Sequence, residues 1–151
     1  MNATVKKYLD ENLYLTLATT CENGEPWSSP LFFAYDNEYI YWWSPKEAVH
    51  SANIRRGGAV FMTLFDSHMK FQTGKGIYLQ GEAEEINDKT AHDAATRAYN
   101  NKIAAPKKSF DKYYLGDSPT RIYRAKITRA WENDVEKQRN YLVDVRYEVT
   151  L

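Results

Sequence analysis

A serine, a lysine and a histidine that could bind an anion lie close together in the segment WWSPKEAVHSANI, residues 42–54. Ser44 is followed by a proline and, three residues on, by Glu47, which is the pattern of a helix capping box. In a capping box the serine and the glutamate side chains each accept a hydrogen bond from a free backbone amide. A helix start also gathers spare amides and the positive end of the helix dipole, to which Lys46 would add an ammonium group. We therefore expect a helix to begin after Ser44, with His50 inside it, and we leave capping alone and anion binding open as alternatives.

The sequence lacks the motifs of hydrolases, zinc proteins and P-loop proteins. It contains neither GxSxG nor HExxH, and the glycine pairs at 57–58 and 74–76 lack the pattern GxxxxGK[ST]. Cys21 is the single cysteine and can form neither an internal disulfide nor a zinc site by itself, so we interpret it as an ordinary half-buried thiol. Three histidines fall in different predicted elements without ligand spacing, namely His50, His68 and His92. We expect no metal site.

The composition indicates a single soluble domain, residues 1–151. Twenty basic residues balance twenty acidic ones, so the chain as a whole would not attract nucleic acid or an anionic membrane. No apolar run approaches the ~20 residues that span a bilayer, and a lone cysteine fits a reducing compartment, so we expect a cytoplasmic protein. Aromatic residues make up 15% of the chain, and such side chains suit barrels, interfaces and planar ligands.

The elements that must position these residues are mostly short strands joined by tight turns. Alternation and β-forming residues predict strands over 14–20, 27–35, 38–43, 59–66, 77–86, 120–131 and 140–151. Helical spacing predicts helices over 3–11, from Ser44 to Arg55-Arg56, and over 87–105, with a short aromatic helix and turn within 108–119. The arginine pair is expected only to complement the carbonyl end of its helix.

This order of elements predicts an α+β fold that is mainly antiparallel β. The first three strands, joined by tight turns, are expected to form a meander. The strand 59–66 is almost continuously apolar, which indicates burial on both faces, and Gly81 inside a strand predicts a bulge or a close backbone approach. A closed or nearly closed barrel best removes exposed strand edges.

The succession of segments resembles the pyridoxamine 5′-phosphate oxidase-like, FMN-binding split-barrel family. The likeness runs over residues 5–86, through PWSSPLFF, WWS, HSANI and GIYLQGEAE, and returns in TRIYRAKITRAWEND at 120–134. It implies a six-stranded split β-barrel with flanking helices. It also implies a homodimer with one FMN in each of two clefts between the protomers, each cleft being lined by both chains.

The resemblance further implies which residues meet the cofactor. They come from the second barrel strand, the end of the next strand, the following helix, a later strand and the partner chain. These are Ser28, Ser29, Pro30 and Leu31 along the flavin ring, Trp43 and Ser44 at the cofactor, Lys46, Val49 and His50 at the phosphate, Lys75 on the later strand, and Trp131 from the partner.

Three positions depart from the family's oxidases. Ser28 and Val49 stand where basic residues are expected, and Gly76 stands where those oxidases carry a glutamine. The loss of forked, charge-assisted donors would weaken the hold on a phosphate. The candidates to replace them are Lys46, His50, Lys75 and the amides at the helix start, and Arg139 is a looser counterpart of a downstream arginine.

Two functions from different classes follow. The first is an FMN-dependent oxidoreductase, in which the flavin performs hydride or electron chemistry and the protein supplies stacking, hydrogen bonds and charge. The second is a non-catalytic dimer that carries or senses FMN, haem or another planar cofactor, and haem would need an axial ligand such as a histidine. We rank flavin above haem; the sequence indicates no substrate.

Overall fold

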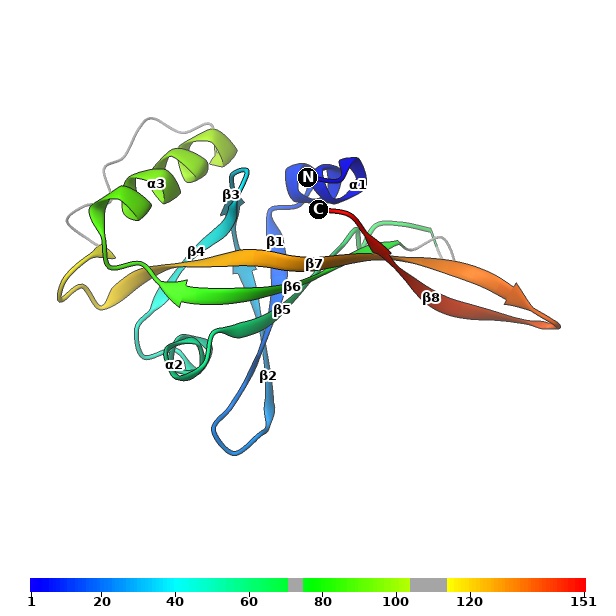
Figure 1. The fold of residues 1–151 in the computed structure, drawn as a ribbon, viewed down its shortest axis with the longest axis horizontal. Coiled ribbons are helices and arrows are strands. Elements are labelled where there is room, and N and C mark those ends of the chain that lie inside the picture. The colour runs from blue at the N-terminus through cyan, green and yellow to red at the C-terminus, as the bar shows by residue number, and fades with distance from the viewer. Residues whose placement is uncertain (71–74, 104–113) are drawn as a thin grey trace.

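The computed structural model describes residues 1–70, 75–103 and 114–151, and its strands form one antiparallel sheet (Figure 1). In chain order the elements are α1 (Ala3–Glu11), β1 (Tyr14–Thr20), β2 (Pro26–Phe32), β3 (Ala34–Tyr35), β4 (Tyr39–Pro45), α2 (Val49–Arg56), β5 (Ala59–Phe65), β6 (Gly76–Glu85), α3 (Lys89–Ile103), β7 (Thr120–Gln138) and β8 (Tyr141–Val149). Among the described residues, no helix has both the length and the apolar character needed to cross a membrane.

The sheet is a split barrel whose two ends are consecutive segments of the chain. The strand order is β2-β1-β5-β6-β7-β4-β3, with β8 added to β7. β2 pairs with β1 up to Phe32, and beyond Phe33 the chain pairs with β4 instead, where Ala34 lies opposite Tyr41. If β2 and β3 are counted as one interrupted strand, six strands make the barrel and the α+β split-barrel prediction is confirmed.

Helix α2 begins at Val49 and not after Ser44, so the capping-box prediction is wrong. Its N-cap is Ala48, which makes no side-chain cap hydrogen bond. Ser44 belongs to β4 and lies opposite Arg121 of β7. Because pairing with a strand far away in the sequence keeps Ser44 extended, the local helix-start pattern is overridden, and the serine hydroxyl is left to find another partner.

The predicted irregularity in β6 is confirmed. The pairing of β6 with β7 shifts register between Gln80 and Gly81. A Cβ built on Gly81 would lie 2.6 Å from the carbonyl oxygen of Lys126. The missing side chain therefore permits a close approach of two backbones at the bulge.

Other expectations are corrected. The meander is wrong because β4 pairs with β7 and β3 and not with the length of β2. β5 buries alternate residues on one face, whereas Phe61 and Thr63 on its other face are only half-buried. The strand predicted to end at residue 131 continues to Gln138. Most of the predicted segment 108–119 lies outside the described residues, and its described end forms a turn at Leu115.

Two apolar clusters hold the barrel and its helices together. The main core lies inside the barrel and includes Trp42, which is fully buried and stacks on Tyr123 with ring centroids 6.1 Å apart. The second cluster lies under α3, where the hydroxyl of Tyr99 donates to the carbonyl of Tyr41 at 3.2 Å. Lys102 of α3 also donates to carbonyl oxygens at the end of α1. These contacts fix α3 and α1 against the sheet.

Candidate functional site

The His50 ring joins three elements at the corner where β4 leads into α2. Its Nε2 atom lies 2.8 Å from Ser44 Oγ at the end of β4, and its Nδ1 atom lies 3.1 Å from Ser29 Oγ on β2. The indole nitrogen of Trp27 donates to the same Ser29 hydroxyl at 3.1 Å. β2 is one end of the sheet and β4 lies next to the other end. The ring therefore ties the barrel together across its split.

Burial favours the neutral form of this histidine. Desolvation lowers the pKa of His50 below its ordinary value, because a charged ring would lose its hydration. A neutral imidazole has one donor and one acceptor nitrogen, so one serine hydroxyl accepts from the ring and the other donates to it. Both nitrogens are thus occupied. In this arrangement His50 offers no free charged donor to a phosphate, which differs from the role that the resemblance implied.

Lys46 and Val49 lie at the surface of the same corner. Both side chains are exposed, and the carbonyl of Lys46 accepts a hydrogen bond of 2.8 Å from Arg55 Nη2. Within the described residues, the ammonium of Lys46 makes no ion pair. Lys46 is therefore a cation that the corner can offer to an anion, beside the first amides of α2. Val49 can offer only its backbone.

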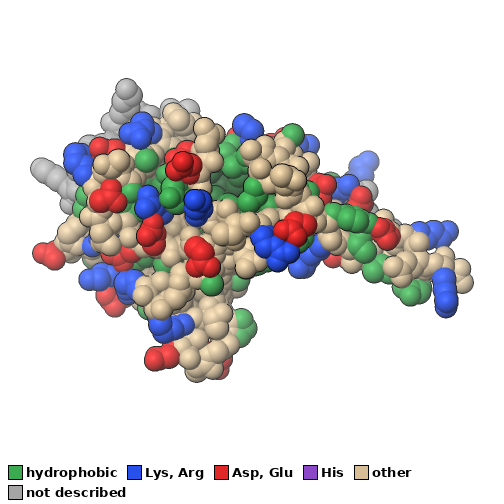
Figure 2. Space-filling model, viewed as in Figure 1, with side chains coloured by type: hydrophobic (Ala, Val, Ile, Leu, Met, Phe, Trp, Pro, Cys, Tyr) green, Lys and Arg blue, Asp and Glu red, His purple; other side chains and the backbone are tan. Residues whose placement is uncertain are grey.

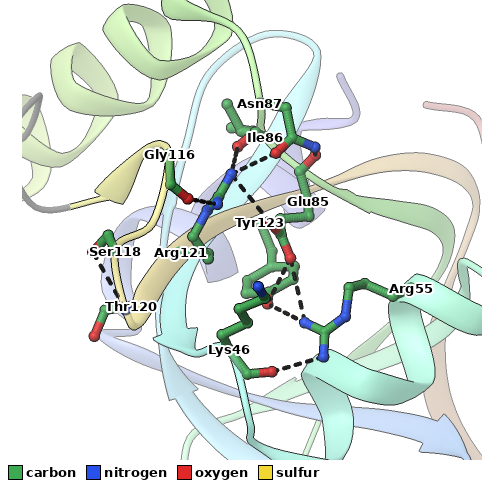
Figure 3. Close-up of polar contacts among 10 residues, drawn as sticks. All are labelled: Lys46, Arg55, Glu85, Ile86, Asn87, Gly116, Ser118, Thr120, Arg121 and Tyr123. Carbon is green, nitrogen blue, oxygen red and sulfur yellow. Dashed lines mark hydrogen bonds and ion pairs between the residues drawn. The ribbon is translucent and has the colours of Figure 1, made fainter.

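A largely buried ion-pair network adjoins this corner (Figure 3). The carboxylate of Glu85, at the end of β6, lies 3.2 Å from Arg121 Nη2 and 3.3 Å from Arg55 Nη1. The hydroxyl of Tyr123 donates to the same carboxylate at 3.2 Å, and burial raises the pKa of Tyr123. The network thus connects α2, β6 and the start of β7, and through Arg55 it holds the carbonyl of Lys46.

Sequence reasoning missed this network. It expected Arg55 only to complement the end of its helix, yet its partners Glu85 and Tyr123 are 30 and 68 residues away. Arg121 also donates to the carbonyl oxygens of Gly116 and Ile86 (Figure 3). The spacing of residues in the sequence does not predict these contacts, because they form only when β6, β7 and α2 pack together.

The residues predicted along the flavin ring point to two different sides of β2. Ser29 faces inward to His50, and Leu31 packs against the main core. Ser28 and Pro30 are exposed on the opposite side, which we call the outer face of the sheet. Side chains alternate along a strand, so only Ser28 and Pro30 of this run can present their side chains to a ligand on the outer face.

Trp43 belongs to an aromatic group at the edge of this outer face. Its ring centroid lies 4.2 Å from that of Tyr99, 6.0 Å from that of Tyr114 and 6.2 Å from that of Phe32. Phe32 follows Pro30 by two residues on β2 and so shares its side of the strand. The structure therefore brings Trp43 next to the predicted β2 residues, but on the side of the sheet opposite to the His50 ring.

Pro30 and Trp131 stand at the two ends of one row across the outer face. Directly paired residues connect them through Thr16, Thr63 and Tyr78. Four inter-strand spacings separate their strands, β2 and β7, which is about 19 Å along the curved sheet. The ring of Trp131 leans back along this row onto Phe61 of β5, with ring centroids 5.9 Å apart, and so reaches to two strands from β2.

Lys75 lies away from the β4–α2 corner as well. Its ammonium is 3.4 Å from a carboxylate oxygen of Asp134 on β7. Ser44 lies opposite Arg121 of that strand, and the rise per residue in a strand puts Asp134 roughly 40 Å further along it.

Within the described residues, no three His, Cys, Asp or Glu side chains gather as metal ligands would.

An antiparallel sheet wound into an open barrel, with a helix at its split and a second helix, α3, over part of its outer face, defines the class of split-barrel proteins. A family model described as pyridoxamine 5′-phosphate oxidase matches residues 1–134. The chain belongs to this family. Among curated proteins, none matches the sequence.

Solved structures are similar to this chain in fold. A candidate 5-nitroimidazole antibiotic resistance protein from Bacteroides thetaiotaomicron has a TM-score of 0.73 at 16% identity, over 87% of this chain and 82% of that one. An FAD-binding protein from Mesorhizobium loti has a TM-score of 0.63 at 20% identity, over 87% and 94%. A heme binding protein from Mycobacterium smegmatis has a TM-score of 0.68 at 17% identity, over 96% and 58%.

Proposed function

We propose that this protein is a homodimeric, FMN-binding oxidoreductase of the cytoplasm. The observation that carries the proposal is the row on the outer face, because it places Pro30 and Trp131 on one surface that a planar ring could cover. A two-fold related copy would bring its Trp131 to the Pro30 end of the first chain. Family membership and the FAD-binding neighbour support a flavin-type cofactor.

The outer face offers contacts that suit a planar ring. Ser28 and Pro30 are exposed there, and Trp43 is half-buried beside Phe32. A proline ring and an indole give flat apolar surface, while the Ser28 hydroxyl can donate to or accept from a ring heteroatom. These residues fit the ring system of a flavin.

At the β4–α2 corner a phosphate group would contact fewer charged donors than at a site with arginine side chains. Lys46 is the exposed ammonium of the corner, and the amides at the start of α2 add the positive end of the helix dipole. His50 is neutral and engaged with two serines, so its role is to hold β2 and β4 in place and not to supply charge. We expect FMN to bind more weakly than at a site with forked arginine donors.

A bound flavin would supply hydride or electron transfer. The chain's own residues would bind and orient it. By fixing the inner side of β2 through Ser29, His50 keeps Ser28 and Pro30 turned outward toward the cofactor. No described side chain of the corner is required as an acid or base.

The absorption spectrum of the purified protein and a titration with FMN test this proposal. We expect the twin bands of an oxidised flavin, or quenching of FMN fluorescence on addition of protein. Lys46→Ala should weaken FMN binding about tenfold, since a hydrogen bond to a charged group contributes about 1.5–3 kcal/mol. Lys89→Ala on α3 is the matched control and should leave the affinity unchanged. A colourless protein that does not quench FMN overturns the proposal.

Turnover distinguishes an oxidoreductase from a protein that only carries the cofactor. An oxidoreductase should bleach when NADH or NADPH is added and regain its colour in air, whereas a carrier would remain oxidised. Sedimentation at micromolar concentration checks the dimer. A monomer there contradicts the shared site.

Haem is the second candidate, and His68 is the observation that favours it. Its side chain is 94% exposed in the turn after β5 and lines the groove beside α1, so its imidazole is accessible to a ligand, whereas both ring nitrogens of His50 are engaged. The heme binding neighbour is consistent with this reading. A Soret band that disappears in His68→Ala would support haem, and a Soret band that persists would exclude His68 as its ligand.

A further inference from the structure

A groove of about 640 Å³ lies between α1, the ends of β1 and β5, and the turn that follows β5. Pro30, Thr16 and Thr63 of the row on the outer face form part of its wall. The groove therefore begins at the Pro30 end of the surface on which we place the flavin ring. A small molecule held in this groove would lie beside the cofactor, which is where a substrate must be.

Two exposed aromatic rings line the groove. Tyr14 and Phe65 are 60% and 56% exposed. Each lies two residues along its strand from the threonine of the row, so both rings are on the same side of the sheet as that row. Tyr14 packs edge to face against Phe32, with ring centroids 5.7 Å apart, and Phe65 lies opposite Gly76, which has no side chain to cover it. The two rings thus offer flat apolar surface with electron-rich faces.

Carboxylates outnumber ammonium groups among the side chains that line the groove. Glu11 at the end of α1 and Asp66 after β5 line it together with Lys7. The ring of His68 lies 3.4 Å from the Asp66 carboxylate, whereas Glu11 has no ion-pair partner in the described part of the chain. Acidic and basic side chains are interspersed over the face shown in Figure 2. The lining side chains therefore decide the sign of a ligand, and here they favour a cation.

The hydroxyl group of Tyr8 is affected by the same carboxylates. Tyr8 lines the groove from α1, and its pKa is raised by burial first and then by the negative charges of Asp66, Glu11 and Glu132. A negative charge raises the pKa of a phenol because it disfavours the phenolate. Carboxylates from α1, from the turn after β5 and from β7 therefore act together on this side of the groove.

We propose that the groove binds a small organic cation that carries an aromatic ring, and that such cations are the substrate class of the flavin site. The inference rests on the proposed function for the cofactor beside the groove. The ring of the ligand packs on Tyr14 and Phe65, and its positive group faces Glu11 and Asp66. Ring and charge are thus recognised by separate parts of the groove. An anion of the same shape would face two carboxylates, and this repulsion provides the selectivity.

A set of probes that share one ring and differ in charge tests this selectivity. At neutral pH phenethylamine is a cation, phenethyl alcohol is neutral and phenylacetate is an anion. Isothermal titration calorimetry on the purified protein measures their affinities. We expect the amine to bind about fivefold more tightly than the alcohol, because exposed ion pairs and cation–π contacts are each weak, and phenylacetate to bind least. An amine that does not bind, or binds no better than the alcohol, overturns the proposal.

Removal of the two carboxylates shows whether the groove is the site. Glu11→Gln combined with Asp66→Asn keeps the side-chain shapes, and asparagine retains an oxygen to accept the hydrogen bond of 2.8 Å from the His68 amide. This variant should lose most of the preference for the amine. Glu22→Gln combined with Glu25→Gln is the matched control, since it removes two exposed carboxylates from the turn at the other end of β1. An equal loss in the control would mean that the amine responds only to net charge, and would overturn the assignment to the groove.

Replacement of one ring tests the aromatic half of the site. Tyr14→Leu should weaken binding of the amine about threefold, because leucine lacks the electron-rich ring face. Tyr141→Leu is the control and should leave the affinity unchanged. Tyr141 is also 60% exposed, but it lies at the tip of the β7–β8 hairpin, which projects from the body of the protein (Figure 1). An unchanged affinity in Tyr14→Leu contradicts the packing of the ligand on this ring.

The outcomes separate this inference from the proposed function. A protein that binds FMN but does not distinguish the amine from the alcohol overturns the cation site and leaves the proposed function standing. Selectivity that is lost in Glu11→Gln with Asp66→Asn, in a protein that does not bind FMN, supports the cation site and overturns its role beside a flavin. A shift of the flavin absorption bands on addition of the amine supports both. If that variant changes sedimentation and leaves the affinity for the amine unchanged, the groove is a protein contact and the proposal is overturned.

Discussion

His50 Nε2 lies 2.8 Å from Ser44 Oγ, and the same ring reaches Ser29 on β2. One buried imidazole therefore connects strands near the two ends of the sheet, where the barrel has no continuous ladder. Polar groups that are buried and fully partnered rigidify their surroundings. The hydrogen bonds of His50 thus hold the β2 surface on which we place the cofactor.

Replacing His50 by alanine should lower the free energy of unfolding by about 1–3 kcal/mol, because two serine hydroxyls lose their buried partner. Urea unfolding monitored by tryptophan fluorescence measures the change. His68→Ala is the matched control, since the His68 side chain is almost fully exposed, and it should change little. Equal effects of the two substitutions would contradict the structural role of His50.

The free energy of unfolding should fall on acidification because of His50. The pKa of His50 is lowered in the folded protein from 6.5, so between its folded and unfolded pKa values the unfolded chain binds more protons. The contribution of the neutral ring is complete above about pH 6.5 and is lost as the pH falls toward the folded pKa. Thermal unfolding of the wild type and His50→Gln across this range measures it. A difference between them that does not change with pH would refute the prediction.

Replacing Arg121 by methionine should cost about 3 kcal/mol or more, because it leaves Glu85 with one fewer partner in a largely buried site. Denaturant unfolding again gives the value. Arg129→Met is the control: its pair with Glu148 is exposed, and exposed ion pairs contribute little. The prediction is wrong if Arg121→Met is no more destabilising than Arg129→Met.

Adding one methyl group at Gly81 should destabilise the protein by about 1–3 kcal/mol, since the new Cβ would press on the carbonyl oxygen of Lys126. Gly57→Ala introduces the same atom where nothing lies within 4 Å and should be nearly neutral. Thermal unfolding of the two variants compares them. A tolerated Gly81→Ala would mean that the bulge can move.

Local signals predicted much of the sheet. β1 has its predicted bounds, and the bulge at Gly81 follows from a glycine inside a strand pattern, because alternation and backbone freedom are properties of a few neighbouring residues. The candidate site was predicted less well. The run from Ser28 to Leu31 was assigned to the ring as a block, yet the pleat of β2 divides it between two faces.

The sequence by itself determined the α+β class, most strands and the chemistry available at the β4–α2 corner, since these depend on residue types and short spacings. Only the tertiary structure decided that Ser44 is a strand residue bonded to His50 and that Arg55 joins Glu85. It also decided that Pro30 and Trp131 end the same row, and that the last hairpin projects as an arm. Each of these depends on pairing between segments tens of residues apart, and no local pattern carries that information.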